Sequence, residues 1–231
     1  TTLFRSRGYS PKKGAPDVAP PAWKQELLDQ GYALAGSNYG AEGWALAEAV
    51  PAQRATIDGF AKVYGRPHRV IAWGQSMGGL VSTALAEHPQ PKIAGAIAMC
   101  PSIGGALGMM NMALDGAFAF RTLAAPDAGL ELVGIGDDMA NGRKAQAAVA
   151  EALKSPQGRA RLALAGVLGG IPGWTRRDAP RPADGDYEAQ LDEIGATFVM
   201  GVFLPRQDQE HRADGQQVTL TMSAVMVPSL V

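Results

Sequence analysis

The chain has 231 residues, a formal net charge of −1, 46% hydrophobic residues and 19% charged residues. This length is typical of one domain, or of one domain with a large insertion, and the apolar share is sufficient for a sizeable core. The near-neutral charge argues against a nucleic-acid partner. A single cysteine, Cys100, excludes a disulfide framework and a cysteine-rich zinc site within this chain.

The uncharged stretch from Ile93 to Leu114 is long enough to cross a bilayer. Pro101 and Gly104 interrupt it, so a buried strand, a loop and a helix explain it better. The sequence begins with Thr1, and no basic segment leads into an apolar run that would form a signal peptide. We therefore expect no membrane span, and the localisation stays unknown, with secretion of a processed chain as one alternative.

The first six residues, Thr1–Ser6, are also the translation of ACG ACG CTC TTC CGA TCT, the end of a common sequencing adapter. We interpret them as a contaminated end of an assembled metagenomic read. The alternative is an ordinary exposed N-terminal tail.

Strands and helices are expected to alternate in the first half of the chain. Ile57, Phe60 and Tyr64 recur at helical spacing, whereas Val70–Trp73 is apolar at successive positions, as in a parallel strand buried on both faces. This order predicts a doubly wound, mostly parallel α/β sheet with right-handed crossovers. Helices are expected at 23–30, 44–64 and 77–87. Strands are expected at 32–38, 69–74 and 93–99, and the last of these is expected to be a second buried strand.

The pattern changes after Pro101, because the segments that follow have mostly helical composition and period. We interpret residues 1–103 as the N-terminal part of the core and 104–215 as a helical cap or insertion. Residues 216–231 are the possible start of a C-terminal core, with a strand at 217–227. The helices are expected at 109–123, 140–153, 158–168 and 187–203.

The motif that indicates chemistry is Gly74-Gln75-Ser76-Met77-Gly78-Gly79. A G-x-S-x-G motif between a buried strand and a helix predicts a nucleophile elbow, a sharp turn that presents a reactive serine. Gly74, Gln75 and Gly78 would form this turn around Ser76, and the glycines allow neighbouring backbone to approach closely. The Met77 N–H, at the start of the helix, would then stabilise an oxyanion. The alternative is a glycine-rich turn with an incidental serine.

With this motif the chain resembles the α/β-hydrolase superfamily, and in particular capped, actinobacterial-type serine hydrolases. The resemblance runs from Gly8 to about Phe203, and it implies a His-Gly-x loop that gives a second oxyanion N–H. Carried over to this sequence, that donor is Tyr9, and Arg7 stands where histidine is expected. The specific segments are Arg7-Gly8-Tyr9-Ser10-Pro11, Gly36-Ser37-Asn38-Tyr39-Gly40 and the 74–79 motif.

The family's triad requires a serine, an acid and a histidine, in that chain order. His68 precedes the strand before the elbow, at the opposite edge of the sheet. His88 ends the helix after the elbow, roughly 17 Å from its start. His211 alone follows the serine at a suitable distance, although it lies in a polar run typical of an exposed loop.

For the acid, the apolar run Leu130–Ile135 resembles a strand that ends near Asp137. A triad of Ser76, Asp137 and His211 is therefore one interpretation. A rival is that Asp137 and Asp138 cap the next helix. The interpretation we favour is a truncated fragment, in which the acid and the histidine come from sequence beyond Val231.

The predicted function is hydrolysis of carboxylic esters through an acyl-enzyme on Ser76. A peptidase or amidase of the same fold is the close alternative, and a non-catalytic fragment or binding protein without a complete triad is the second class. A small ester or a short peptide is the expected partner, and the oligomeric state stays open. No metal-ligand spacing, P-loop or dinucleotide motif occurs, so we expect no cofactor or metal. Cys100 is expected to be buried packing.

Overall fold

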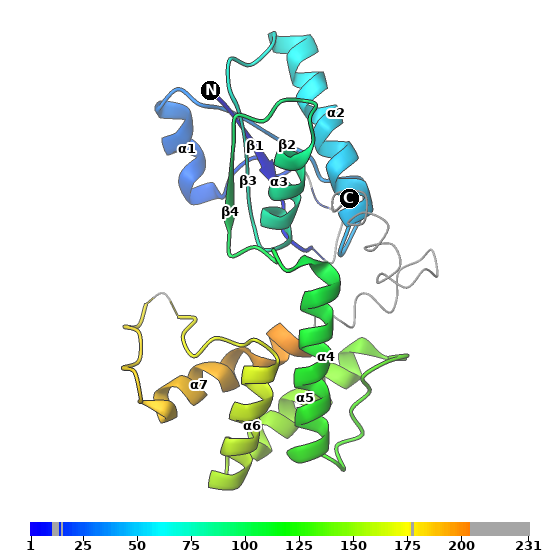
Figure 1. Ribbon diagram of the computed structural model, residues 1–231, viewed down its shortest axis with the longest axis vertical. Helices are drawn as coiled ribbons and strands as arrows, with labels where there is room; N and C mark the ends of the chain where they lie inside the picture. The colour runs from blue at the N-terminus through cyan, green and yellow to red at the C-terminus, as the bar shows by residue number, and fades with distance from the viewer. Residues whose placement is uncertain (11–13, 15, 177, 204–231) are drawn as a thin grey trace. The chain divides into compact units, whose positions relative to one another are not determined.

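The computed structural model describes residues 1–10, 14, 16–176 and 178–203. They form two compact units, one from Thr1 to Leu107 and one that begins at Gly108 (Figure 1). The first unit is built around a β-sheet, and the second is helical. Each unit has its own core and is described separately.

The sheet has four parallel strands in the order β2-β1-β3-β4. Helix α1 follows β1, and Figure 1 shows it on one face of the sheet, with α2 and α3 on the other. Helices on both faces of a parallel sheet confirm the predicted doubly wound α/β class. The elements are β1 (Thr2–Ser6), α1 (Pro21–Asp29), β2 (Ala33–Gly36), α2 (Leu46–Tyr64), β3 (Val70–Gln75), α3 (Met77–Glu87) and β4 (Gly95–Met99).

Strand β1 lies between β2 and β3, and its side chains alternate between the two faces. Phe4 packs with Ile57 of α2 and with Val70, whereas Leu3 packs with Trp73 on the face that α1 covers. The strand is almost wholly buried. Residues 2–6 are therefore an interior strand, and the interpretation as an exposed N-terminal tail is wrong.

Strand β4 is the last strand in the described sheet order, and it is not the second buried strand that the sequence predicts. The side chain of Ile97 is 52% exposed, and Ala96 is exposed as well. Cys100, directly after this strand, is also exposed, so the expectation of buried packing is wrong. An apolar run indicates a strand, but it does not say whether that strand has neighbours on both sides.

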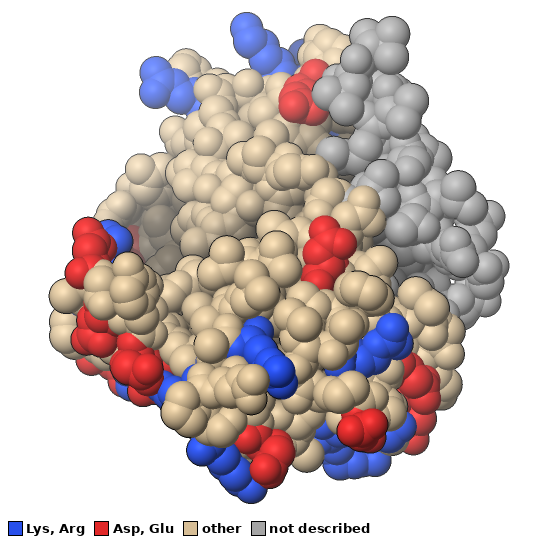
Figure 2. Space-filling model, turned by 60° about the horizontal axis from the view of Figure 1, so that its bottom comes forward, with Lys and Arg blue, Asp and Glu red and all other residues tan. Residues whose placement is uncertain are grey.

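The second unit contains four helices and one terminal π-helical turn among the described residues. Phe120, Leu162, Phe198 and Val202 are fully buried and form the centre of its core. On the face of the molecule that Figure 2 shows, acidic and basic side chains are interspersed, as expected for helices exposed to solvent. The elements are α4 (Gly105–Leu123), which starts in the first unit, α5 (Asp138–Ala152), α6 (Pro156–Leu168), α7 (Tyr187–Phe198) and η1 (Val199–Phe203).

The prediction of a strand at Leu130–Ile135 is wrong, because these residues form an irregular loop with bends at 132–134. Leu130 and Leu132 are buried in the helical core, which explains why the run is apolar. The predicted strand at 217–227 lies outside the described residues. A cap role for residues 104–215 stays a prediction.

Among the described residues, none of the helices combines the length and the apolar composition that crossing a bilayer requires.

Candidate active site

Ser76 is the single residue between the end of β3 and the start of α3. Its backbone has φ 57° and ψ −125°, and non-glycine residues seldom adopt a positive φ. Its N–H donates to Met99 O at 3.0 Å, and its carbonyl accepts from Gly79 N–H at 3.0 Å. Gln75 and Ser76 are both exposed to solvent. The motif therefore forms the strand–turn–helix arrangement that its residues predict.

The glycines of the motif bring the end of β1 against the start of α3. A Cβ at Gly74 would lie 2.5 Å from Ser6 O, and one at Gly78 would overlap Ser6 O and lie 2.8 Å from Arg7 O. Both distances are too short for any side chain. Only glycine at these positions allows the chain after β1 to pass directly beside the elbow.

The loop after β1 contacts the elbow at Gly8. A Cβ at Gly8 would lie 3.3 Å from Gln75 O and 4.0 Å from Ser76 Cβ. Tyr9 follows, with its ring 5.9 Å from that of Trp44 and its side chain partly exposed. The amide group of Tyr9 therefore belongs to the segment that lies beside Ser76.

A cleft of about 490 Å³ opens at this edge of the sheet. The chain leaves β1 toward one face and leaves β3 toward the other, so the carboxyl ends of these neighbouring strands diverge. Parallel α/β sheets bind ligands at such switch points. The residues that line the cleft are Arg5, Arg7, Gly8, Tyr9, Ser10, Gly14, Asp17, Gln75 and Ser76.

Arg7 is 6% exposed, and its guanidinium donates to three backbone carbonyls. The acceptors are Gly8 O at 2.9 Å, Ala41 O at 2.6 Å and Asn38 O at 3.4 Å. Burial lowers the pKa of Arg7, which nevertheless remains charged at neutral pH. Nothing in the local sequence indicated these partners, because they lie up to 34 residues away.

Tyr39 completes the surroundings of Arg7. The guanidinium lies over the Tyr39 ring, 4.7 Å from its centroid, and the Tyr39 hydroxyl donates to Arg7 O at 3.2 Å. Burial raises the pKa of Tyr39 to about 12, so the hydroxyl stays protonated and remains a donor. Arg5, two residues earlier in the chain, instead forms an ion pair with Asp17.

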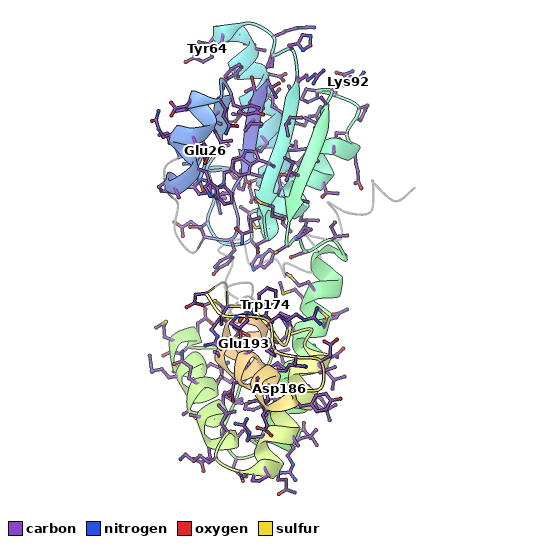
Figure 3. The ribbon with its side chains drawn as sticks, turned by 90° about the vertical axis from the view of Figure 1, so that its left-hand side faces the viewer. Glu26, Tyr64, Lys92, Trp174, Asp186 and Glu193 are labelled. Atoms are coloured by element: carbon purple, nitrogen blue, oxygen red, sulfur yellow. The ribbon has the colours of Figure 1, made fainter. Side chains whose placement is uncertain are left out.

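The two described histidines lie far from Ser76. His68 is exposed just before β3, and His88 follows the last residue of α3. Both are at the amino end of the strands, the end where Figure 3 labels Tyr64 and Lys92. His211 lies outside the described residues, so its role as the base stays a prediction.

Asp137 caps α5, since its carboxylate accepts from Ala140 N–H at 2.8 Å. This is the structural role that the sequence offered as a rival to catalysis, although Asp138 is the first residue of the helix rather than part of the cap. Asp137 belongs to the helical unit, and its role as the catalytic acid stays a prediction. Among the described residues, no three acidic, histidine or cysteine side chains are placed to hold a metal ion together.

Comparison with known proteins adds two findings. A family model described as "Alpha/beta hydrolase family" matches residues 5–227. The chain is also similar to an o-phthalyl amidase from Xanthobacter agilis, with 28% identity over an alignment of 222 residues that covers 84% of this chain and 49% of the amidase. The chain therefore spans about half the length of this curated relative. No solved structure gives a significant match.

Proposed function

We propose, from the premise that the chain belongs to the alpha/beta hydrolase family, that it hydrolyses carboxylic esters through an acyl-enzyme on Ser76. The family and the amidase relative support hydrolase activity. The observation that carries the more specific proposal is the backbone of Ser76. A residue held at φ 57° between a buried strand and a helix is costly, and such strain occurs preferentially at functional sites.

In the first step the Ser76 oxygen attacks the substrate carbonyl carbon. A C–O bond forms, the carbonyl π electrons move to oxygen as an oxyanion, and the serine proton passes to a base. When the oxyanion collapses, the bond to the leaving alcohol breaks, and the alcohol takes the proton from the base. Water then attacks the acyl-enzyme in the same manner, which releases the acid and restores Ser76.

Two backbone donors would stabilise the oxyanion. The Met77 N–H is in the first turn of α3, where N–H groups have no intrahelical acceptor and the helix dipole favours negative charge. The Tyr9 N–H belongs to the segment that contacts the elbow through Gly8. Donors of this kind act most strongly on charge that develops in the transition state.

The base is proposed to be a histidine oriented by an acid. His68 and His88 lie at the other end of the sheet unit, so neither supplies it. The remaining sources are His211, with Asp137 as the acid, or a histidine and an acid from sequence outside this chain. If neither source delivers a base to Ser76, the chain is a non-catalytic fragment or a binding protein.

Amide hydrolysis is the second candidate activity, and the similarity to an amidase favours it. The same nucleophile and oxyanion donors cleave a C–N bond when the leaving amine is protonated. A p-nitrophenyl ester and a p-nitroanilide of the same acid separate the two activities, because the substrates differ only in the oxygen or nitrogen atom of the scissile bond and both require Ser76.

A fluorophosphonate probe tests the proposal, since it labels only an activated serine. We expect the chain to be labelled, and Ser76→Ala to lose both labelling and ester hydrolysis, with kcat/KM lower by about 10³-fold or more. Ser155→Ala in the helical unit is the matched serine control and should be labelled like the parent. Absence of labelling in the parent, with the fold intact by circular dichroism, would mean that no base reaches Ser76 in this chain, and it would favour a non-catalytic fragment or a binding protein over an active hydrolase.

A further inference from the structure

We infer that Arg7 is a positioning residue, which orients the Gly8–Tyr9 peptide so that the Tyr9 N–H faces the oxyanion site at Ser76. The inference deepens the proposed function and rests on it. It starts from the unusual surroundings of the Arg7 guanidinium, which is buried at the edge of the cleft and bonded to backbone carbonyls.

The first step concerns the peptide between Gly8 and Tyr9. Its carbonyl oxygen accepts from Arg7 Nη1 at 2.9 Å. In a planar trans peptide the C=O and the N–H point in opposite directions. A guanidinium that holds the Gly8 oxygen on one side therefore directs the Tyr9 N–H to the other side.

The second step concerns what fixes Arg7. Its other donors bond to Asn38 O and Ala41 O, which lie in the loop between β2 and α2. That loop is ordered by its own side chains, since Ser37 Oγ accepts from Tyr39 N–H at 3.0 Å and Asn38 Oδ1 accepts from Gly40 N–H at 3.1 Å. The guanidinium thus anchors the loop after β1 to the loop between β2 and α2.

Tyr39 holds Arg7 from two directions. Its ring lies against the guanidinium, and its hydroxyl bonds to the carbonyl of Arg7. The planar fork of an arginine can reach several carbonyls at once, whereas the ammonium of a lysine is a single point of donation. The geometry therefore requires the shape of the guanidinium and not only its positive charge.

The closeness of Gly8 to the elbow makes the orientation matter for catalysis. A Cβ at Gly8 would already lie 3.3 Å from Gln75 O, so the segment has little room to shift toward the turn. Oxyanion donors act only over a narrow distance range, about 2.7–3.1 Å from the developing charge. A tilt of the Gly8–Tyr9 peptide would therefore reduce transition-state stabilisation and leave substrate binding largely unchanged.

Arg7→Lys tests the inference, because it keeps the charge and removes the fork. We expect kcat for a chromogenic ester to fall by about 10²-fold with KM changed less than threefold, the pattern for loss of one oxyanion donor. Arg121→Lys is the matched control, since Arg121 also lies over an aromatic ring, that of Phe118, in the helical unit. It should leave both constants unchanged.

Arg7→Ala with added guanidinium ion separates geometry from general stability. A few millimolar guanidinium, far below denaturing concentrations, should restore part of kcat, whereas methylammonium at the same concentration should not. Equal rescue by both ions, or a folded Arg7→Lys variant with kcat within twofold of the parent, would overturn the inference.

If the Arg7 variants do not fold, Tyr39→Phe takes their place, because it keeps the ring over the guanidinium and removes the hydroxyl, with its bonds to Arg7 O and to the Ser6 side chain. It should lower kcat several-fold at unchanged KM, and an unchanged kcat would overturn the inference.

The ¹⁵N–¹H cross-peak of Tyr9 is a readout that does not require activity. Arg7→Lys, or Tyr39→Phe where the former is unfolded, should shift this cross-peak more than that of Gly65, the residue that follows the last residue of α2. An unshifted Tyr9 cross-peak overturns the positioning role. If the parent shows no labelling that depends on Ser76 but the cross-peak shifts, the proposed function fails and the positioning of the peptide stands.

Discussion

Among the described residues, each of the two units buries one charged side chain, and the hydrogen-bond partners of the two differ in kind. In the helical unit, Glu193 of α7 is 2% exposed, and its carboxylate accepts from the N–H groups of Thr175 and Arg176 at 3.0 and 3.2 Å. The Thr175 hydroxyl and the Arg176 guanidinium also bond to it. In the sheet unit, Arg7 donates to carbonyls, and no ion pair with a carboxylate is found for it among the described residues.

This difference separates a buried charge that stabilises the fold, Glu193, from one that lies at the candidate active site, Arg7. Arg176 neutralises the charge of Glu193. The hydrogen bonds that Glu193 accepts attach the loop after Trp174 to α7. Figure 3 labels Trp174 and Glu193 in this part of the helical unit. Among the residues that the structure describes, carbonyl dipoles and no carboxylate meet the charge of Arg7, which lines the cleft of Ser76. Burying a charge without a counter-ion is costly, so its position at the cleft favours a role in the site.

The largest expected effect tests the close backbone approach in the sheet unit. A Cβ in Gly78→Ala overlaps Ser6 O and lies 2.8 Å from Arg7 O, both backbone atoms that cannot rotate away. We expect the free energy of unfolding, measured by urea titration, to fall by about 3 kcal/mol or more. Labelling of Ser76 by the fluorophosphonate probe should fall as well, because relief of the overlap separates the Arg7 loop from the elbow.

Two other glycine-to-alanine substitutions test whether the loss of labelling is specific to the elbow in the sheet unit. Gly158→Ala in α6 meets Ala152 O in the same way, so it should also lower stability, but labelling of the folded fraction should match the parent. Gly59→Ala in α2 has no heavy atom within 4 Å of the added Cβ and should be neutral or stabilising. Normal stability of Gly78→Ala would contradict the packing described for the elbow.

The next largest expected effect concerns Glu193, the buried carboxylate that Arg176 neutralises. Hydrogen bonds from Thr175 N–H, opposed by burial and helped by Arg176, lower the pKa of Glu193 from 4.5 to about 2. A carboxylate with a lowered folded-state pKa contributes stability that is fully present above pH 4.5 and is lost as the pH falls toward 2. Glu193→Gln should therefore lower Tm by several degrees at pH 7, and the difference from the parent should shrink between pH 4.5 and 2.

Glu188→Gln is the control for this pH dependence. Glu188 pairs with Arg159 on the surface, where its side chain is 78% exposed. Exposed ion pairs contribute little to stability, so Tm should change by no more than about 1 °C. If both variants show the same pH dependence, Glu193 is not the source of the acid sensitivity.

Much of the fold follows from local patterns in the sequence. The run Val70–Trp73 and the motif after it predicted β3, the turn at Ser76 and α3, because buried parallel strands and glycine-rich turns have local signatures. The exposure of β4 could not be predicted, since the neighbours of a strand depend on the whole sheet order. The apolar run Leu130–Ile135 was mistaken for a strand, because burial against helices produces the same composition.

The candidate site was predictable only in part. Ser76, Met77 and Gly8 lie in short motifs, so their mutual placement follows from a strand, a turn and a loop. The partners of Arg7 are backbone carbonyls of residues 38 and 41, and any residue type provides a carbonyl. Sequence patterns carry no signal for such acceptors, and the role of Arg7 therefore required the structure.

The smallest effect asks whether the helical unit supplies the acid. Asp137→Ala removes the bond to Ala140 N–H and should lower the free energy of unfolding by about 1 kcal/mol, whereas Asp137→Ser keeps an N-cap and should lose less. Asp186→Ala removes the matching cap of α7, from Ala189 N–H, and serves as the control. If Asp137 only caps α5, all three variants hydrolyse esters like the parent. A stable Asp137→Ser variant with kcat lower by 10²-fold or more would instead identify Asp137 as the acid, and the chemistry would then no longer belong to the sheet unit alone.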